Sequence, residues 1–364
     1  MATENETVSV GLESNGYDIF IGPNELQRLG DLYLKLAGDR HAIVITDNNV
    51  AGHYLDQVVD ALQTVSKRVD SIVVAAGEKS KSIQQCDNLW QKMMELKGDR
   101  SSLVVALGGG VIGDLAGFAA AGFMRGIPFI QVPTSLMAQV DSSVGGKTGV
   151  NLPQGKNLVG AFHQPEFVLI QTSTLDTLDD QNFCAGMAEV IKYGMIMDAE
   201  FFEFLESNAD AIVSRDEQIL RQMIATCCRC KARVVEEDER EITGRRAILN
   251  YGHTFGHAVE SVYGYGSYLH GEAVGIGMRC AARLAETKGM ISQEVVDRQN
   301  RLLDRVGLAH KLGPEKHEQI LAAMKHDKKS AGGAPQLILP DRLGNVKLYD
   351  WPGDEVVKAA LSEP

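Results

Sequence analysis

The chain lacks the features that mark small secreted or cysteine-rich proteins. Of its six cysteines, Cys227, Cys228 and Cys230 share a segment with helical periodicity. We interpret these three as packed, reduced thiols rather than as metal ligands or a disulfide scaffold. The first residues combine no basic segment with an apolar run, so no secretory signal is expected. Reduced thiols without a signal predict a cytoplasmic location.

An excess of positive charge is also missing. The 364 residues carry a formal net charge of −12 at pH 7. Nucleic acids and anionic membranes select basic surfaces, so neither is an expected partner. A small anionic substrate is still compatible with this charge, because a local cationic pocket can exist in an acidic protein.

Long hydrophobic runs free of glycine are absent as well. The segment 104–124 contains a single charged residue, Asp114, but it also contains six glycines. We interpret it as a buried strand, a glycine-rich turn and a packed helix rather than a membrane span. The length suggests about two domains, and the apolar fraction of 44% is ordinary for a globular protein.

The first half of the chain alternates short apolar runs with helical patterns. Residues 7–21 alternate apolar and polar side chains around Ser14-Asn15-Gly16, which predicts a hairpin. Strands are predicted at 42–46, 71–75, 103–107, 127–132 and 167–170, with helices at 50–64 and 82–97. Such alternation is typical of a mostly parallel sheet whose faces are covered by helices.

After about residue 178 the pattern becomes helical. Helices are predicted at 181–196, 216–236, 251–262, 272–288 and 292–306, and only 336–340 and 346–349 look extended. The sequence therefore predicts an α/β domain over residues 1–178 and a mainly α-helical domain over 179–364. Ligand clefts are common where two domains meet.

A candidate nucleotide loop follows the predicted strand 103–107. The segment GGGVIGD (108–114) leads into a helical pattern, and a helix start presents free N–H groups to phosphate. It is neither a G-x-G-x-x-G fingerprint nor a P-loop, so tight packing alone explains it equally well. Asp47 and the segment GEKSK (77–81) follow two neighbouring strands and add to the case for a nucleotide. An acidic Asp47 would repel a 2′-phosphate and favours NAD over NADP.

Basic residues recur near glycine-rich segments. Lys147, Lys156 and Asn157 lie in two such loops, which are phosphate-binding candidates. Further basic residues beside motif-like segments are Arg125, Lys192, Lys231, Arg246 and Lys328. Each taken singly is more often a solvated surface charge. Lys192 is three residues from Glu189, and Arg246 is seven residues before His253. Because Glu189 and His253 are candidate metal ligands, basic groups near them suggest a substrate with phosphate and carboxylate groups.

Histidines in the second half suggest a metal site. His253 and His257 are one helical turn apart, so by spacing alone both would be ligands. A third histidine, His270, opens His-Gly-Glu, and Glu189 lies upstream. Two imidazoles and a carboxylate form a set that zinc accepts with one position left open.

At these residues the chain resembles the 3-dehydroquinate synthases of the sugar-phosphate cyclase superfamily. The matching segments are GEKSK (77–81), GGGVIGD (108–114), PTSLMAQVDSSVGGKTGVN (133–151), GKNLVGAFHQP (155–165), AGMAEVIKYG (185–194), LNYGHTFGHAVE (249–260) and HGEAV (270–274). The resemblance covers nearly the whole chain. It implies an NAD-binding α/β domain with a mostly parallel sheet, joined to a helical domain that binds metal and substrate, with the site between them.

The resemblance also implies roles for individual residues. The metal ligands, for Zn2+ or Co2+, become Glu189, His253 and His270, so His257 moves from the ligand set to substrate binding or proton transfer. NAD+ contacts fall on Asp47, Glu78, Lys81, Gly109, Gly110, Val111, Asp114, Thr134, Ser135, Lys147, Lys156, Thr174 and Thr177. Substrate contacts fall on Asp141, Lys147, Asn157, Lys192, Lys231, Arg246, Asn250, His257 and Lys328. Lys329 is an alternative to Lys328, and Arg125 resembles a residue lent across a homodimer interface.

The implied reaction is the conversion of 3-deoxy-D-arabino-heptulosonate 7-phosphate to 3-dehydroquinate and phosphate, with NAD+ oxidising the substrate only transiently. Other possible functions are a different sugar-phosphate cyclase, making 2-deoxy-scyllo-inosose or an epi-valiolone, and a metal-dependent polyol dehydrogenase. An NAD- or metal-sensing binding protein is the non-enzymatic alternative.

Overall fold

The computed structural model describes residues 5–264, 266–329 and 336–362, without the side chains of Pro314 and of residues 326–329. The chain divides into two compact units. Unit 1 consists of Met1–Leu178 and Leu220–Arg240, and unit 2 of Asp179–Ile219 and Glu241–Pro364. Among the described residues, no helix combines the length and apolar character needed to cross a membrane.

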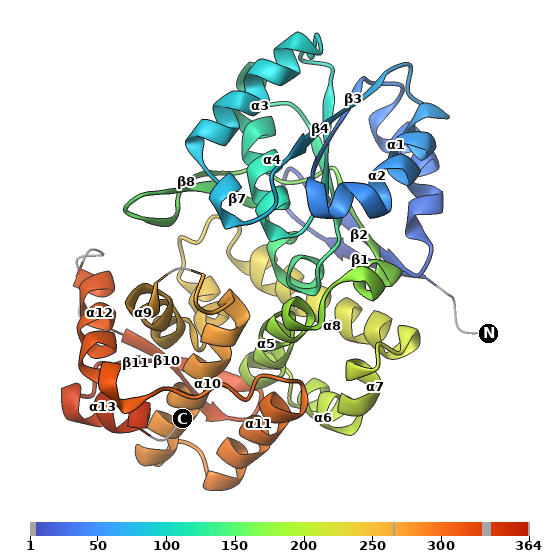
Figure 1. The fold of residues 1–364 in the computed structure, drawn as a ribbon. Helices are drawn as coiled ribbons and strands as arrows, with labels where there is room; N and C mark the ends of the chain where they lie inside the picture. The colour runs from blue at the N-terminus through green and yellow to red at the C-terminus, as the bar shows by residue number, and fades with distance from the viewer. Residues whose placement is uncertain (1–4, 265, 330–335, 363–364) are drawn as a thin grey trace. The chain divides into compact units, whose positions relative to one another are not determined.

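Unit 1 is built on a seven-stranded sheet in the order β1-β2-β9-β6-β5-β3-β4. Figure 1 labels β1, β2, β3 and β4 of this sheet. Its strands are β1 (Glu6–Val10), β2 (Tyr17–Gly22), β3 (Ala42–Asp47), β4 (Val69–Val74), β5 (Leu103–Gly108), β6 (Phe129–Pro133) and β9 (Phe167–Gln171). β1 and β2 form the predicted antiparallel hairpin, and the other pairs are parallel. The mostly parallel sheet predicted from strand–helix alternation is confirmed.

Helices cover both faces of this sheet. They are α1 (Leu29–Ala37), α2 (Asn48–Gln63), α3 (Ile83–Glu95) and α4 (Gly110–Gly122). Alternate residues of a strand point to opposite faces. Ile43 and Val104 accordingly pack in one apolar cluster with residues of α3 and α4, whereas Val44 and Val105 pack in a second cluster with residues of α1 and α2. Burial on both faces explains why these strands read as unbroken apolar runs.

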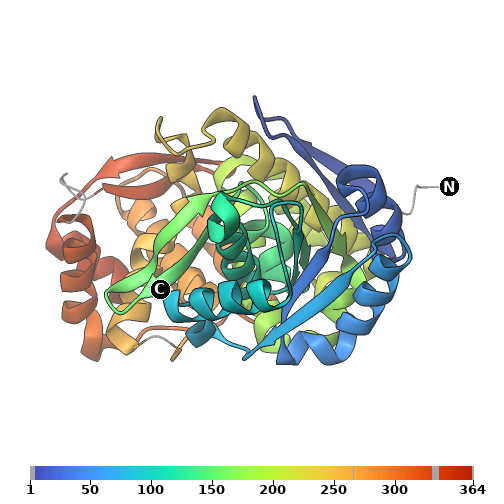
Figure 2. The same ribbon diagram turned by 90° about the horizontal axis from the view of Figure 1, so that it is seen from above.

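A second hairpin, β7 (Lys147–Leu152) and β8 (Gly155–Phe162), extends from unit 1 (Figure 2). The glycine-rich sequence predicts loops at these residues, and the structure shows two strands instead. Gly149 pairs with Gly160 in the hairpin, and an added Cβ at Gly160 would overlap the backbone of Thr148. Glycine is a poor strand former on average, so a pairing that depends on it escapes pattern analysis.

Most of the helix α8 (Glu217–Glu237) belongs to a different unit from the one that the predicted domain division gives it. It is the predicted helix at 216–236, but residues 220–240 belong to unit 1 and not to the helical unit. The Cys228 thiol donates to the carbonyl of Gln139 at 3.3 Å, and the Lys231 ammonium donates to the carbonyl of Asp141 at 2.6 Å. These tertiary contacts are invisible to periodicity, and the boundary after residue 178 stays a prediction.

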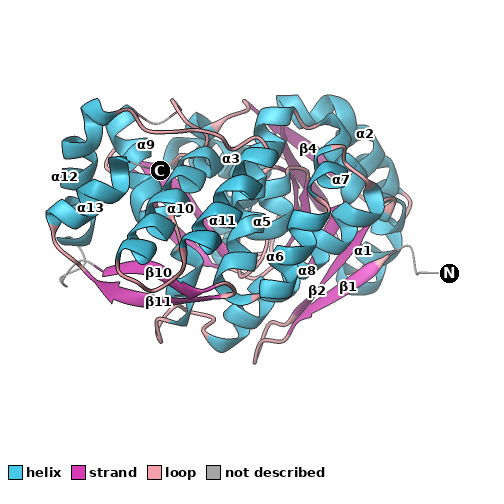
Figure 3. Cartoon of the chain, turned by 90° about the horizontal axis from the view of Figure 1, so that it is seen from below, coloured by secondary structure: helices cyan, strands magenta, loops and turns pink. Residues whose placement is uncertain are grey.

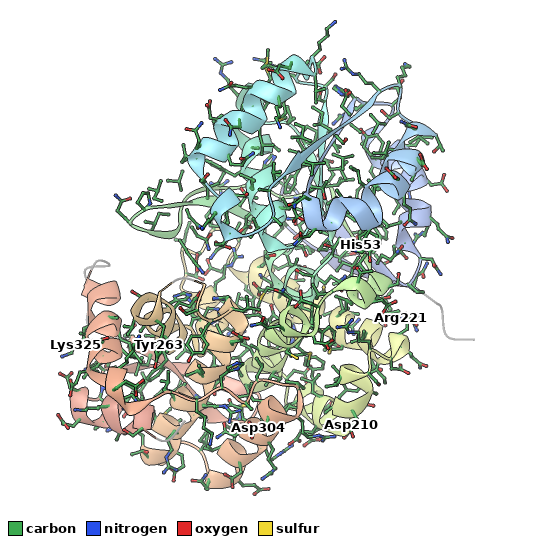
Figure 4. All side chains as sticks on the ribbon, in the orientation of Figure 1. His53, Asp210, Arg221, Tyr263, Asp304 and Lys325 are labelled. Carbon is green, nitrogen blue, oxygen red and sulfur yellow. The ribbon has the colours of Figure 1, made fainter. Side chains whose placement is uncertain are left out.

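Unit 2 is mainly helical, as predicted (Figure 3). Its helices are α5 (Asp180–Met197), α6 (Ala199–Ser207), α7 (Ala209–Val213), α9 (His253–Tyr263), α10 (His270–Thr287), α11 (Gln293–Arg305), α12 (His317–Lys329) and α13 (Asp354–Ser362). The two extended segments form an antiparallel pair, β10 (Gln336–Arg342) and β11 (Asn345–Asp350). Arg279 of α10 donates to Asp304 of α11, which Figure 4 labels, and ties these two helices together.

Close backbone approach brings α5, α9 and α10 together. An added Cβ at Gly277 of α10 would overlap the carbonyl oxygen of Gly252, the residue before α9. A Cβ at Gly271, the second residue of α10, would overlap the carbonyl oxygen of Ala185 in α5. Glycine is needed at both positions because no side chain fits there. These contacts position the side chains discussed next.

Candidate metal and cofactor sites

Three helices of unit 2 each contribute one side chain to a carboxylate–histidine cluster. Glu189 lies in the middle of α5, and His253 and His270 are the first residues of α9 and α10. His253 Nε2 lies 3.4 Å from Glu189 Oε1, and His270 Nε2 lies 3.9 Å from the same oxygen. One ligand atom from each residue lies within 4.8 Å of the others. Ligand atoms about 2.0–2.2 Å from a tetrahedral zinc ion lie roughly 3.3–3.6 Å apart, so the spacing suits such an ion.

The surroundings of Glu189 also fit a cation. The residue is 1% exposed, and within the described part of the chain its Oε1 atom accepts no hydrogen bond. Lys192 lies against Oε2 as an ion pair. A buried carboxylate is costly unless positive charge faces it. The donor set of one carboxylate and two imidazoles therefore fits a divalent metal ion.

Each histidine of the cluster is oriented through its other ring nitrogen. His253 Nδ1 donates to the backbone carbonyl of Tyr251 at 3.1 Å, and His270 Nδ1 donates to Glu260 Oε2 at 3.1 Å. Both Nε2 atoms then face Glu189 as lone-pair donors. Burial, followed by the nearby charge of Lys192, holds the pKa of His253 well below its usual value. A neutral imidazole is the form that binds metal.

His257 lies apart from the Glu189 cluster. Its ring is centred 5.5 Å from that of His253 and 5.7 Å from that of His270. It is exposed, and together with Glu260 and His270 it forms a second group of possible ligands. Spacing alone pairs His253 with His257, whereas the grouping with Glu189 selects His253 and His270.

The other substrate candidates of unit 2 lie on several elements. Lys192 and Arg246 are buried at 1% and 2% exposure, which is unusual for side chains with a permanent charge. Asn250 closes the short helix Arg245–Asn250 that leads to Gly252 and α9. The side chains of Lys328 and its alternative Lys329, at the end of α12, lie outside the described residues.

In unit 1 the predicted nucleotide loop joins β5 to α4. Gly109 is the N-cap of α4, and the helix begins with Gly110, Val111 and Ile112. An added Cβ at Gly109 would lie 3.2 Å from the Ser135 hydroxyl, and one at Gly110 would lie 3.0 Å from the Ser142 hydroxyl. The exposed N–H groups of a helix start suit a pyrophosphate.

Charged residues predicted for NAD+ interact next to this loop. Lys81 forms an ion pair with Asp114 of α4, and both side chains are largely buried. Burial raises the pKa of Asp114, and the charge of Lys81 opposes that rise. Asp47 caps α2 by accepting from the N–H groups of Asn49 and Val50, so it has a structural role whether or not it also binds a ribose. Glu78 accepts from the Asn151 amide at 2.7 Å.

A buried amide, Gln139, contacts one of the remaining predicted NAD+ positions, Thr174. The Gln139 side chain donates to the carbonyls of Pro133 and Gln171 and to the Thr174 hydroxyl, at 2.9–3.3 Å. Thr134 follows Pro133 directly, and the Thr177 hydroxyl bonds to that of Tyr54 at 2.6 Å. Gln139 is absent from the predicted residues, because nothing in its spacing distinguishes it from an ordinary helical glutamine.

The basic substrate candidates of unit 1 are held in different ways. Lys231 forms an ion pair with Asp141 at 2.9 Å. Lys147 is the first residue of β7, and Lys156 is the second residue of β8. Asn157 has a φ of +56°, and its N–H donates to the Asn151 side chain. Arg125 is exposed and has a φ of +70°, after Met124 at +49°. Consecutive left-handed residues other than glycine are uncommon, so this turn is held in a strained form.

Comparison with known proteins identifies the fold. Among solved structures, a 2-deoxy-scyllo-inosose synthase complexed with carbaglucose-6-phosphate, NAD+ and Co2+ is 27% identical with a TM-score of 0.88, over 98% of this chain and 99% of that chain. A 2-epi-5-epi-valiolone synthase from Streptomyces hygroscopicus subsp. jinggangensis, with NAD+ and Zn2+ bound, is 26% identical with a TM-score of 0.88, over 97% of each chain. The fold is therefore that of the dehydroquinate synthase-like cyclases.

Sequence comparison narrows the class further. Residues 71–185 match the 3-dehydroquinate synthase N-terminal family and residues 186–330 match the C-terminal one. The 3-dehydroquinate synthase of Rhodopirellula baltica is 46% identical over 98% of this chain and 97% of its own length. The chain belongs to the 3-dehydroquinate synthase family, and the resemblance noted in the sequence is confirmed.

Proposed function

We propose that this chain is an enzyme that converts 3-deoxy-D-arabino-heptulosonate 7-phosphate to 3-dehydroquinate and phosphate, a step towards the aromatic amino acids. Its cofactors are NAD+ and a divalent metal ion, either Zn2+ or Co2+. The observation that carries the proposal is the convergence of Glu189, His253 and His270 in a chain of this family. When bound, NAD+ accepts and returns a hydride, and the cation polarises a substrate hydroxyl.

In this proposal the chain's own residues orient the substrate and hold its charges. Glu189, His253 and His270 hold the cation, and the buried Lys192 lies beside them. Lys147, Asn157, Arg246 and His257 bind the phosphate group. Each charge-assisted hydrogen bond contributes about 1.5–3 kcal/mol. Asp141 keeps Lys231 in place through the ion pair between them.

The proton steps need few protein groups. Oxidation of a ring hydroxyl to a ketone acidifies the neighbouring C–H, whose proton passes to the departing phosphate as that group is eliminated. The ketone is then reduced again, and ring opening with an intramolecular aldol closure gives the product. Fixing one reactive conformation of the substrate is the main contribution of the protein.

Two further parts of the proposal concern assembly and location. We propose a homodimer in which the exposed Arg125 serves the site of the second copy, and the strained turn that carries Arg125 supports a role for that side chain. We also propose a cytoplasmic location, in keeping with the reduced thiols.

The decisive experiment is phosphate release from the heptulosonate phosphate, with and without a chelator. We expect release that stops on chelation, resumes with Zn2+ or Co2+, and proceeds with catalytic NAD+ and no accumulation of NADH. Stoichiometric NADH would identify a polyol dehydrogenase instead. Parallel assays with the substrates of the 2-deoxy-scyllo-inosose and epi-valiolone synthases separate this function from the other cyclases, and binding without turnover would indicate a sensor.

A further inference from the structure

Glu260 is a buried carboxylate that contacts His270, a residue of the proposed metal cluster, at the ring nitrogen that does not face Glu189. It lies on α9, two turns after His253, and is 3% exposed. Its Oε2 atom lies 3.1 Å from His270 Nδ1. A carboxylate oxygen that is ionised can only accept a hydrogen bond, so Nδ1 carries the ring proton and Nε2 carries the lone pair. That lone pair is on the side of the ring that faces Glu189.

We propose that Glu260 is the positioning residue of the metal site: it fixes the tautomer and the ring orientation of His270 and strengthens Nε2 as a donor. The inference rests on the proposed function, because it presumes a metal ion at Glu189, His253 and His270. A carboxylate behind a histidine ligand raises the basicity of that ligand, and loss of such a partner typically costs about 10–100-fold in metal affinity.

The two histidines of the cluster differ in this respect. His253 Nδ1 donates to the neutral carbonyl of Tyr251, two residues away and before the same helix begins. That bond is local and survives any side-chain substitution. His270 depends instead on a side chain of another helix, ten residues earlier in the chain. The His270 side chain is also 35% exposed, against 13% for His253, so fewer packing contacts hold the His270 ring in place. His270 is therefore the ligand whose orientation depends on a side chain of another helix.

A second interpretation assigns Glu260 as a ligand in its own right. His257, Glu260 and His270 also offer three donor atoms within 4.8 Å of one another. His270 cannot serve both groups through the same nitrogen: Nδ1 faces Glu260 and Nε2 faces Glu189. A metal on the second group would add an ion or replace the first one, so stoichiometry and the ligand variants distinguish the interpretations.

The test compares Glu260→Gln and Glu260→Ala with a matched control, Glu272→Gln. Glu272 is 4% exposed and lies two residues from His270, but its carboxylate accepts from the Leu269 N–H and the Gln181 amide. The measurements are the Zn2+ dissociation constant, by competition with a chromophoric chelator, and the visible spectrum of the Co2+-loaded protein. We expect Zn2+ binding about 10-fold weaker in Glu260→Gln and up to about 100-fold weaker in Glu260→Ala, with a shifted Co2+ spectrum in both. Glu272→Gln should bind within twofold of the parent chain.

Each outcome decides between interpretations. Zn2+ binding within threefold of the parent in both Glu260 variants overturns the inference, as does a stoichiometry of two metal ions per chain. Thermal unfolding of the metal-free proteins checks the fold, and Glu260→Gln alone carries the test if Glu260→Ala does not fold. His270→Ala separates this inference from the proposed function. If His270→Ala keeps full metal affinity, the proposed site fails; if it loses metal while the Glu260 variants do not, only the role of Glu260 fails.

Discussion

Lys192 and Glu189, one helical turn apart on α5, form an ion pair in which both side chains are almost completely buried. The carboxylate of a proposed metal ligand is thus neutralised by a proposed substrate-binding lysine. Burial of either charge alone would be unfavourable, because the desolvation of an unpaired ion costs several kcal/mol. The pair therefore couples the stability of unit 2 to the charges at the site.

Replacement of Lys192 tests this coupling. In metal-free protein, Lys192→Met leaves Glu189 without its cationic partner and should lower the free energy of unfolding by about 3–5 kcal/mol. Saturating Zn2+ should recover much of that loss, since a bound cation stabilises the folded state by mass action. Denaturant titrations with and without Zn2+ measure both quantities. The double variant Glu189→Gln/Lys192→Met is the control, and an equal loss in it would show that packing rather than charge is responsible.

Removal of a proposed ligand should separate metal binding from folding. In His270→Ala we expect loss of bound metal and of phosphate release, with a far-UV circular dichroism spectrum like that of the parent chain. The reason is that His270 is the first residue of α10 and its ring is partly exposed, so little packing is lost. Metal analysis of the purified protein and the phosphate assay check this. Retention of both metal and activity would contradict the ligand assignment.

The contact between α9 and α10 makes a third prediction. Gly277→Ala places a methyl group on the carbonyl oxygen of Gly252 and should destabilise the chain by about 1–3 kcal/mol. It should also weaken Zn2+ binding, because His253 follows Gly252 directly. Gly275→Ala is the matched control on the same helix, since its nearest neighbour would lie 3.7 Å away. That control should be neutral or stabilising by up to about 1 kcal/mol. Equal behaviour of the two variants would refute the packing argument.

The Lys81–Asp114 pair predicts a pH-dependent effect. The pKa of Asp114 is raised by burial, so the folded state binds more protons than the unfolded state between the ordinary pKa of 3.8 and the raised one. Across that window stability falls as the pH rises. Lys81→Met removes the charge that opposes the shift and should raise this pKa further. We expect the free energy of unfolding of Lys81→Met to be about 2–3 kcal/mol lower than that of the parent chain at pH 7, and this difference to become smaller towards pH 4. Urea titrations at several pH values test this, with Lys81→Met/Asp114→Asn as the control; a loss independent of pH would contradict it.

Apolar periodicity predicts the sheet of unit 1 better than any other part of the fold. The central strands β3 and β5 lie near the predicted ranges because strands buried on both faces have no polar positions to blur the signal. Apolar periodicity gives no signal for β7 and β8, where Gly149 and Gly160 pair. The helical pattern of residues 220–240 predicts that they belong to the helical domain, although Lys231 and Cys228 contact Asp141 and Gln139 in unit 1.

For the site, spacing and resemblance pointed to different residues. Helical spacing relates only neighbours on one helix, and it therefore paired His253 with His257. The ligand set Glu189, His253 and His270 came from the resemblance to a family, and the structure groups these three side chains. Glu260 stands within the quoted segment LNYGHTFGHAVE, but its meaning depends on where His270 lies.

By itself, the sequence determined the alternation of strands and helices, the family and the types of side chain available for chemistry. Those properties are local, because periodicity and glycine placement act over a few residues. Only the tertiary structure decided that Glu189 meets two histidines more than sixty residues further along the chain, and that Glu260 supports one of them. The physical reason is that α5, α9 and α10 approach each other through backbone contacts at Gly271 and Gly277, and such contacts between distant segments leave no periodic signal.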